Sequence, residues 1–140
     1  MQNRSLAVAG VALVVGAGVS ACGGTQTVPR PAAHVTIDGY THVARPAACS
    51  QEQSYRTINI PDRDGELQAT VLLSGERVIP QWVRIRNVDG FTGSFWQGGV
   101  GQAHVDLSRG RYTIIGSAYG INTSNPNKVV TTDFKIVADC

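Results

Sequence analysis

The chain has 140 residues, 12 lysines and arginines against 10 aspartates and glutamates, and 42% hydrophobic side chains. This near-balanced charge excludes the basic surplus of nucleic-acid-binding proteins and the acidic blocks of solvating tails. The length suits one domain with one hydrophobic core and is too short for two.

The first 22 residues have the order of a secretory signal. Residues 1–4 carry one positive side chain, residues 5–18 are uncharged and mostly small or aliphatic, and residues 19–22 read Val-Ser-Ala-Cys. Charge, apolar run and small residues before a cleavage site, in that order, are typical of exported proteins. The apolar run is short and rich in Ala and Gly, whereas a membrane span needs about 20 residues of helix.

The cysteine at this cleavage site makes the prediction more specific. Val19-Ser20-Ala21-Cys22 resembles the lipobox of bacterial lipoproteins, in which the cysteine is acylated and the preceding peptide bond is cut. Two or three acyl chains, at about 0.8 kcal/mol per buried CH₂, hold a protein on a membrane far more firmly than one chain. We predict a signal peptide over residues 1–21 and a lipid anchor on Cys22. A plain secretory signal with a chance cysteine is the alternative.

Residues 22–33 are predicted to form a short tether. The stretch Gly23–Ala33 has two prolines and no hydrophobic period. A flexible chain of this length spans about 20 Å. The folded domain, residues 34–140, is therefore expected to stay close to the membrane.

From residue 34 onward the sequence consists of short alternating runs separated by Gly, Pro, Asn and Asp, which is the pattern of an all-β protein. The expected strands cover residues 35–37, 40–44, 54–60, 67–73, 78–88, 91–96, 103–107, 112–119 and 129–137. In the last of these, Phe134, Ile136 and Ala138 share an apolar face with Cys140. We predict a small antiparallel β-sandwich of about eight or nine strands. A barrel with a ligand in its interior is the second choice.

Two cysteines remain for the domain once Cys22 is assigned to lipid. In an exported chain such a pair, Cys49 and Cys140, is expected to form a disulfide. On the loop-entropy model, closure of so long a loop stabilises the fold by about 4–5 kcal/mol, less any strain. Two free thiols are the alternative.

A search for catalytic or metal-binding groups finds little. No Gly-x-Ser-x-Gly elbow is present, and the three histidines are His34, His42 and His104. His34 and His42 flank the predicted Asp38-Gly39 turn, where surface polar residues are a better interpretation than a metal or catalytic pair. The run Asp62–Glu66 reads as a charged turn because a strand follows it in place of the remaining ligands of a calcium loop. We predict no enzyme, no cofactor and no metal site.

One strand face carries Trp82, Arg84 and Arg86, which alternate with Val83 and Ile85. Trp and Arg are enriched in binding hot spots, so these three residues form a candidate contact patch for an anionic glycolipid, a lipid headgroup or a protein partner. The alternative is a solvated face on which the arginine stems pack against the indole. By contrast, Phe91 and Phe95 are expected in the core.

Several ordered elements resemble the LpqH family of mycobacterial lipoprotein antigens over roughly residues 35–140. They are Val35–Gly39, Cys49, Asn87–Gly90, Gly99–Gln102, Tyr112–Ile114, Gly116–Gly120, Asn125-Pro126 and Phe134–Val137 before a terminal cysteine. The resemblance implies a surface lipoprotein without known catalysis, associated with antigenicity, host Toll-like receptors and ligand transport. It also carries over Cys22 as the acylation site and Cys49 with Cys140 as the disulfide. The tether departs from the family pattern because Thr25 and Thr27 are its only hydroxyl residues, which puts linker glycosylation in doubt.

We therefore expect a non-enzymatic lipoprotein of the cell envelope, lipid-anchored on the outer face of the cell membrane. Its β-domain is expected to act as an antigen and adhesion module, with a host Toll-like receptor or a glycolipid as candidate partner. The alternative function is lipid or glycolipid transport, which requires an apolar pocket of about 300–1,000 Å³ in the β-domain. The sequence leaves the oligomeric state open.

Overall fold

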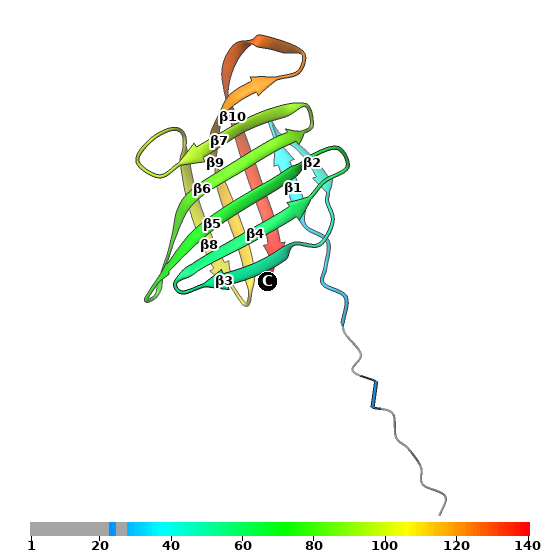
Figure 1. Cartoon of the computed structure of the whole chain (residues 1–140), viewed down its shortest axis with the longest axis vertical. Coiled ribbons are helices and arrows are strands. Elements are labelled where there is room, and N and C mark those ends of the chain that lie inside the picture. The colour runs from blue at the N-terminus through cyan, green and yellow to red at the C-terminus, as the bar shows by residue number, and fades with distance from the viewer. Residues whose placement is uncertain (1–22, 25–27) are drawn as a thin grey trace, which may run out of the picture.

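The computed structural model describes residues 23–24 and 28–140, so the predicted signal peptide and Cys22 lie outside the described residues. Ten strands make up the domain (Figure 1). They are β1 (His34–Ile37), β2 (Tyr40–Val43), β3 (Ala48–Glu52), β4 (Tyr55–Pro61), β5 (Glu66–Ser74), β6 (Arg77–Val88), β7 (Phe91–Trp96), β8 (Gln102–Ser108), β9 (Arg111–Asn122) and β10 (Asn125–Asp139). In this part of the chain, no helix is long and apolar enough to cross a membrane.

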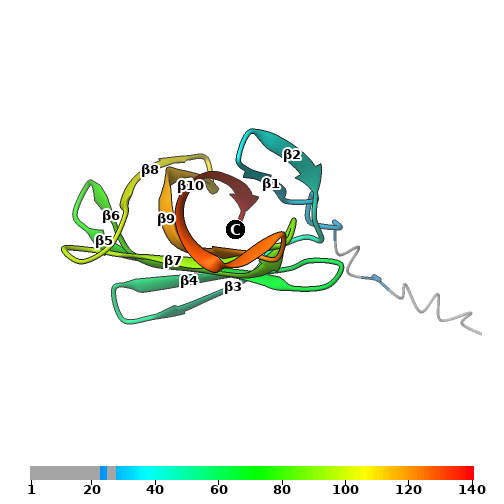
Figure 2. The same cartoon turned by 90° about the horizontal axis from the view of Figure 1, so that it is seen from above.

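The strands form one antiparallel sheet that folds over into two layers. Its order is β2-β1-β10-β9-β7-β6-β5-β4-β3, with β8 also paired to β9. Seen from above, β3 to β7 form one layer and β1, β2, β8, β9 and β10 the other (Figure 2). The long strand β9 joins the layers, because residues 111–117 pair with β8 and residues 119–122 pair with β7.

The two layers enclose a core that follows the alternation in the sequence. Phe91 and Phe95 are 0% and 2% exposed, which confirms them as core residues. On β10, Phe134, Ile136 and Ala138 are buried as predicted. Each large apolar side chain buried in this way contributes about 1.5–3 kcal/mol to folding.

The all-β prediction is confirmed, but the strand count was low by one because β3 was missed. Its sequence, ACSQE, has one apolar residue next to a half-buried cysteine and is otherwise exposed. An edge strand of this kind carries no hydrophobic alternation and is held by backbone pairing to β4. The sheet path ends at β2 and β3 without closing, so the barrel alternative is not the observed fold.

The disulfide Cys49–Cys140 ties the two layers together. It joins the edge strand β3 to the end of the chain after β10, between residues that are 91 positions apart in sequence and whose Cα atoms are 5.8 Å apart. The backbone N–H of Cys140 also donates to the carbonyl of Gly110 at 2.8 Å. The last strand is therefore fixed at its free end.

The chain before β1 is already attached to the domain. Arg30 Nη1 donates to the carbonyl of Ala47 at 3.2 Å. Ala33, placed at the end of the predicted tether, is fully buried, and its carbonyl accepts from Ala44 N–H at 2.8 Å. Only residues 23–29 lie between Cys22 and Arg30 in the sequence.

Candidate functional site

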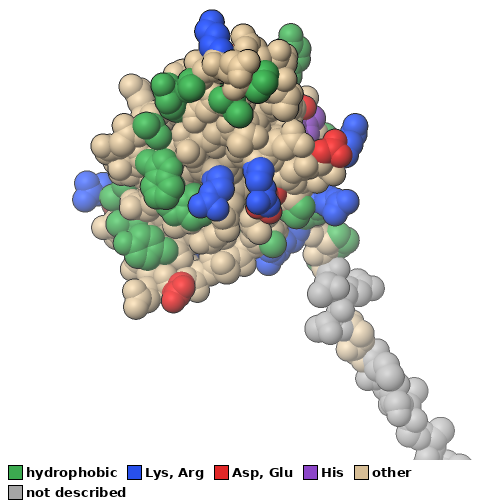
Figure 3. All heavy atoms as spheres, turned by 45° about the horizontal axis from the view of Figure 1, so that its top comes forward, with side chains coloured by type: hydrophobic (Ala, Val, Ile, Leu, Met, Phe, Trp, Pro, Cys, Tyr) green, Lys and Arg blue, Asp and Glu red, His purple; other side chains and the backbone are tan. Residues whose placement is uncertain are grey.

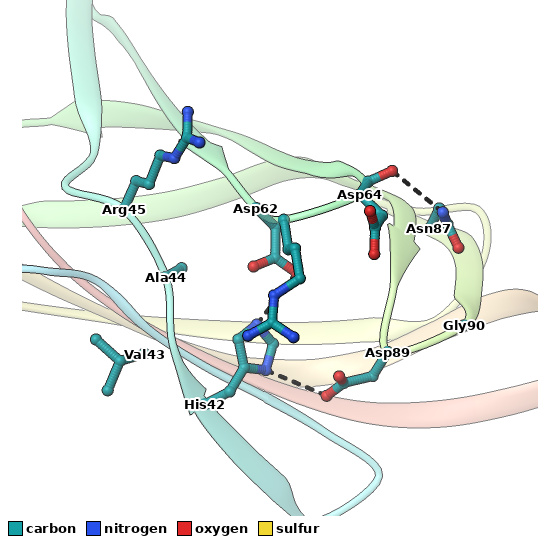
Figure 4. A pocket seen from close by; sticks show the side chains of 10 residues that line it. His42, Val43, Ala44, Arg45, Asp62, Asp64, Asn87, Asp89 and Gly90 are labelled. Atoms are coloured by element: carbon teal, nitrogen blue, oxygen red, sulfur yellow. Dashed lines mark hydrogen bonds and ion pairs between the residues drawn. The ribbon is translucent and has the colours of Figure 1, made fainter.

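A pocket of about 580 Å³ opens where the two layers meet (Figure 4). The edge strand β2 and the chain after it form one side, and the β4–β5 and β6–β7 turns form the other. Its lining residues are His42, Val43, Ala44, Arg45, Asp62, Arg63, Asp64, Asn87, Asp89 and Gly90. Most of them carry a charge, an imidazole or an amide, so the pocket is polar.

His42 lies between two carboxylates in this pocket. Its Nδ1 donates to Asp89 Oδ2 at 3.1 Å, as the dashed line in Figure 4 marks. Its Nε2 is 3.2 Å from Asp62 Oδ2 but has no hydrogen-bond partner of good geometry. The side chain is 27% exposed. The ring therefore connects β2 to turns that come from the other layer.

The β6–β7 turn fixes the position of Asp89. Asp89 and Gly90 have φ values of 50° and 74°, the two left-handed residues of a tight hairpin for which Asp-Gly is a preferred pair. Just before it, Asn87 has φ 48° where the β6–β7 register shifts, which is the geometry of a bulge. Because the turn leaves little freedom, the Asp89 carboxylate is held facing β2.

The β4–β5 turn is held against the end of β6. Asp62 N–H donates to the Gly65 carbonyl at 3.0 Å, and Asn87 Nδ2 donates to the Asp64 carbonyl at 3.1 Å. A Cβ at Gly65 would overlap the carbonyl oxygen of Arg86, so only glycine fits at this approach. The contact places Asp62 and Asp64 on the pocket rim.

The pocket offers charged and polar hydrogen-bond donors and acceptors but no hydroxyl or thiol side chain. Its lining includes three aspartates and two arginines, with no serine, threonine or cysteine. Arg45 and Arg63 make no ion pair within residues 28–140. In the same part of the chain, no group of three or more His, Cys, Asp or Glu side chains is arranged to hold a metal ion. This lining therefore suits a polar ligand.

A second pocket of about 330 Å³ adjoins the first at Asp89. It is lined by Ile37, Asp38, Tyr40, Asp89, Asn122 and Thr132. Neither pocket has the predominantly apolar lining that a lipid carrier requires.

The structure agrees with the predicted surface position of His34 and corrects it for His42. The register pairs His34 with Val43 and Val35 with His42, so the imidazoles lie on opposite faces of the β1–β2 hairpin. His34 is exposed, whereas His42 is partly buried and hydrogen-bonded. No local sequence pattern indicates the His42–Asp89 contact, because these residues are 47 positions apart.

The register of the predicted Arg–Trp strand face is as expected. Val83 and Ile85 are 1% and 0% exposed, so Trp82, Arg84 and Arg86 point outward. The Arg84 guanidinium lies 5.5 Å from the centre of the Trp82 ring, and Trp82 stacks on Trp96 at 6.3 Å.

One member of the predicted contact patch already has a partner within the domain. Arg86 pairs with Glu66 on the neighbouring strand β5. Register explains the pair, because Arg86 and Glu66 lie directly opposite each other. Arg84 faces Gln68 at the corresponding position and has no such partner within residues 28–140.

Residues 26–140 match the family model described as the Mycobacterium 19 kDa lipoprotein antigen. The chain belongs to this family. The predicted resemblance to mycobacterial lipoprotein antigens is thereby confirmed. Family membership makes the chain a lipoprotein associated with the membrane of the cell envelope.

Full-length relatives from mycobacteria agree with this assignment. The chain is 66% identical over 140 residues to "Probable lipoprotein LppE" of Mycobacterium tuberculosis (strain ATCC 25618 / H37Rv), and the match covers all of both chains. It is 36% identical to a putative lipoprotein of Mycobacterium avium subsp. hominissuis (strain TH135), covering all of this chain and 97% of the relative. It is 33% identical to a putative lipoprotein of Mycobacterium indicus pranii (strain DSM 45239 / MTCC 9506), over the whole of both chains.

Proposed function

We propose that this chain is a non-enzymatic lipoprotein, anchored by acyl chains on Cys22 to the outer face of the cell membrane. Its β-domain acts as an antigen and adhesion module, and its acylated end engages a host Toll-like receptor. Membership of the 19 kDa lipoprotein antigen family is the observation that carries this proposal. The sequence Val19-Ser20-Ala21-Cys22 supplies the acylation site.

The domain has the properties that a binding module outside the cell needs. The disulfide closes a long loop and joins the two layers, which stabilises the fold and is a bond that persists in an oxidising environment. The pocket around His42 adds a polar surface for recognition, and its lining has no hydroxyl or thiol side chain. These features support binding over catalysis.

Anchoring is tested by changing Cys22 to Ala in a mycobacterial host. The wild type should incorporate labelled palmitate and partition into the detergent phase, whereas the variant should lose the label. A Thr25→Ala variant, changed just beyond the cleavage site, should behave like the wild type. A Cys22→Ala protein that loses its signal peptide and still partitions into detergent would contradict the proposal.

Receptor engagement is tested with the same proteins on cells that carry a Toll-like-receptor reporter. The acylated wild type should activate the reporter, and the Cys22→Ala variant should not. Equal activation by both proteins would show that the acyl chains are not what the receptor recognises.

A further inference from the structure

A band of aromatic, aliphatic and cationic side chains, with Thr92 and Ser94 between them on β7, runs across the outer surface of four strands. Cross-strand pairing places Trp82 beside Trp96, Arg84 beside Ser94, and Ser94 beside Tyr119. Two residues after Tyr119 on β9, Ile121 lies between Thr92 of β7 and Val129 of β10. We call this surface the aromatic face; its members are Trp82, Arg84, Trp96, Tyr119, Ile121 and Val129.

The aromatic face exposes apolar groups that have no covering element in the domain. Trp96, Tyr119, Ile121 and Val129 are each between 40% and 52% exposed. Figure 3 shows hydrophobic side chains gathered on this side of the molecule, next to basic side chains. Neither of the two pockets includes a residue of the face, so it is a surface rather than a cleft. Exposed apolar side chains grouped on one face in this way mark an interaction site.

The tether between Cys22 and the domain is short, which limits how far the domain can move from the membrane. Residues 23–29 are the only chain between Cys22 and Arg30, which is hydrogen-bonded to the domain. Even fully extended, seven residues reach only about 25 Å. If Cys22 carries the anchor as proposed, the domain surface is therefore always close to lipid headgroups.

We propose that the aromatic face docks on anionic lipid headgroups of the membrane that holds the anchor. Trp and Tyr favour the membrane–water interface because their rings are apolar with one polar group. Among the described residues Arg84 has no carboxylate partner, and an anionic membrane surface attracts such a positive side chain. The acyl chains already hold the protein on the membrane. Docking therefore adds a fixed orientation of the domain and not the attachment itself. This inference rests on the proposed acylation of Cys22.

The chain provides its own reporter for this contact. Its two tryptophans, Trp82 and Trp96, both belong to the aromatic face. The acylated protein is reconstituted in vesicles whose lipids are brominated near the headgroup end of the acyl chain. In vesicles that contain phosphatidylglycerol, the bromine should quench the tryptophan fluorescence. In vesicles of phosphatidylcholine alone, the quenching should be weaker.

Arg84→Ser should shift the equilibrium between docked and free domain about fivefold toward the free state. The matched control is Lys135→Ser, which removes one exposed positive charge from β10 where it pairs with β1, in the other layer. This control should quench like the wild type. Ile121→Ser should also weaken quenching, because it removes an apolar group from the face. Far-ultraviolet circular dichroism checks that each variant is folded.

Flotation of the vesicles separates the failure of docking from the failure of anchoring. Protein that floats with the vesicles but is not quenched would overturn docking and leave the anchor in place. Equal quenching in neutral and anionic vesicles, or equal effects of Arg84→Ser and Lys135→Ser, would overturn the assignment to anionic lipid. Protein that does not float with anionic vesicles at low salt would overturn both the anchor and the docking.

Discussion

His42 and Asp89 are joined by a hydrogen bond of 3.1 Å that links the edge strand β2 of one layer to the β6–β7 turn of the other. Near the same ring, Asp62 from the β4–β5 turn lies 3.2 Å from Nε2. One imidazole thus connects three segments that are distant in sequence. β1 pairs with β10, but β2 pairs only with β1 on the sheet path, so this contact ties the outer strand of the hairpin to the other layer.

Replacement of His42 by Ala should therefore loosen the β1–β2 hairpin. We expect a loss of about 0.5–1 kcal/mol in the free energy of unfolding, because a single hydrogen bond contributes about 1 kcal/mol and Asp89 is half exposed to screening solvent. Urea unfolding followed by tryptophan fluorescence measures the change. His34→Ala, on the other face of the same hairpin, is the control and should change stability by less. An equal loss in both variants would contradict this role for His42.

The disulfide should provide a large part of the stability. We expect the double variant Cys49→Ala/Cys140→Ala to lose about 2–5 kcal/mol of the free energy of unfolding, because the closed loop is long and the bond joins the layers. Chemical denaturation of both proteins measures this difference. Trapping with an alkylating reagent provides the control: the native wild-type domain should have no reactive thiol at Cys49 or Cys140. Two reactive thiols in the native protein would contradict the pairing.

The last strand also carries a group whose charge controls stability in acid. Arg111 Nε and Nη2 donate to the two oxygens of Asp139 at 2.8 and 3.0 Å. This hydrogen bonding, aided by the charge of Arg111, lowers the pKa of Asp139 below its ordinary value of 3.8. A lowered pKa means that the carboxylate stabilises the fold above the unfolded value and that this stabilisation is lost as the pH falls through the folded value.

Asp139→Asn should therefore be less stable than the wild type at neutral pH. The difference should stay constant down to a pH of about 5 and shrink as the pH falls below about 4, where the wild type also loses the charge. Thermal melts across this pH range test the expectation. As a control, Asp133→Asn removes an exposed carboxylate of β10 that has no ion pair within residues 28–140 and should show no such dependence. A difference that grows in acid would reverse the sign and contradict the assignment.

The sequence predicts the fold wherever a local pattern determines it. The burial of Val83 and Ile85 and the outward direction of Trp82 and Arg84 follow from simple alternation. The partner of Arg86 does not, because β6 is irregular on both sides. The β5–β6 register shifts between Thr70 and Val71, and the β6–β7 register shifts between Ile85 and Val88. No periodic pattern specifies where such bulges lie.

The candidate pocket could not be predicted from the sequence for a related reason. Its charged residues come from β2, the β4–β5 turn and the β6–β7 turn, and each segment alone reads as an ordinary polar turn or edge. Only the folding of one sheet into two layers brings His42 to Asp62 and Asp89. Long-range geometry of this kind leaves no local sequence pattern.

The approach of the β4–β5 turn to β6 gives the last prediction, which concerns Gly65. A methyl group at this position would overlap the carbonyl oxygens of Arg86 and Asn87, which belong to backbone and cannot move like a flexible side chain. Gly65→Ala should therefore push the turn away from β6 and weaken the Asn87–Asp64 hydrogen bond. We expect a loss of about 1–3 kcal/mol in the free energy of unfolding, as is usual for overpacking.

The matched control for this substitution is Gly99→Ala. There the added Cβ would lie 3.4 Å from the nearest atom, Trp96 Cβ, which is close to ordinary contact. It should change stability by less than about 0.5 kcal/mol, as most surface substitutions do. Amide hydrogen exchange should also report the site directly: in Gly65→Ala, the N–H of Asp62, bonded to the Gly65 carbonyl, should lose protection. Unchanged stability and unchanged protection of Asp62 in Gly65→Ala would show that the two segments are not in contact, and that the pocket wall they form is open.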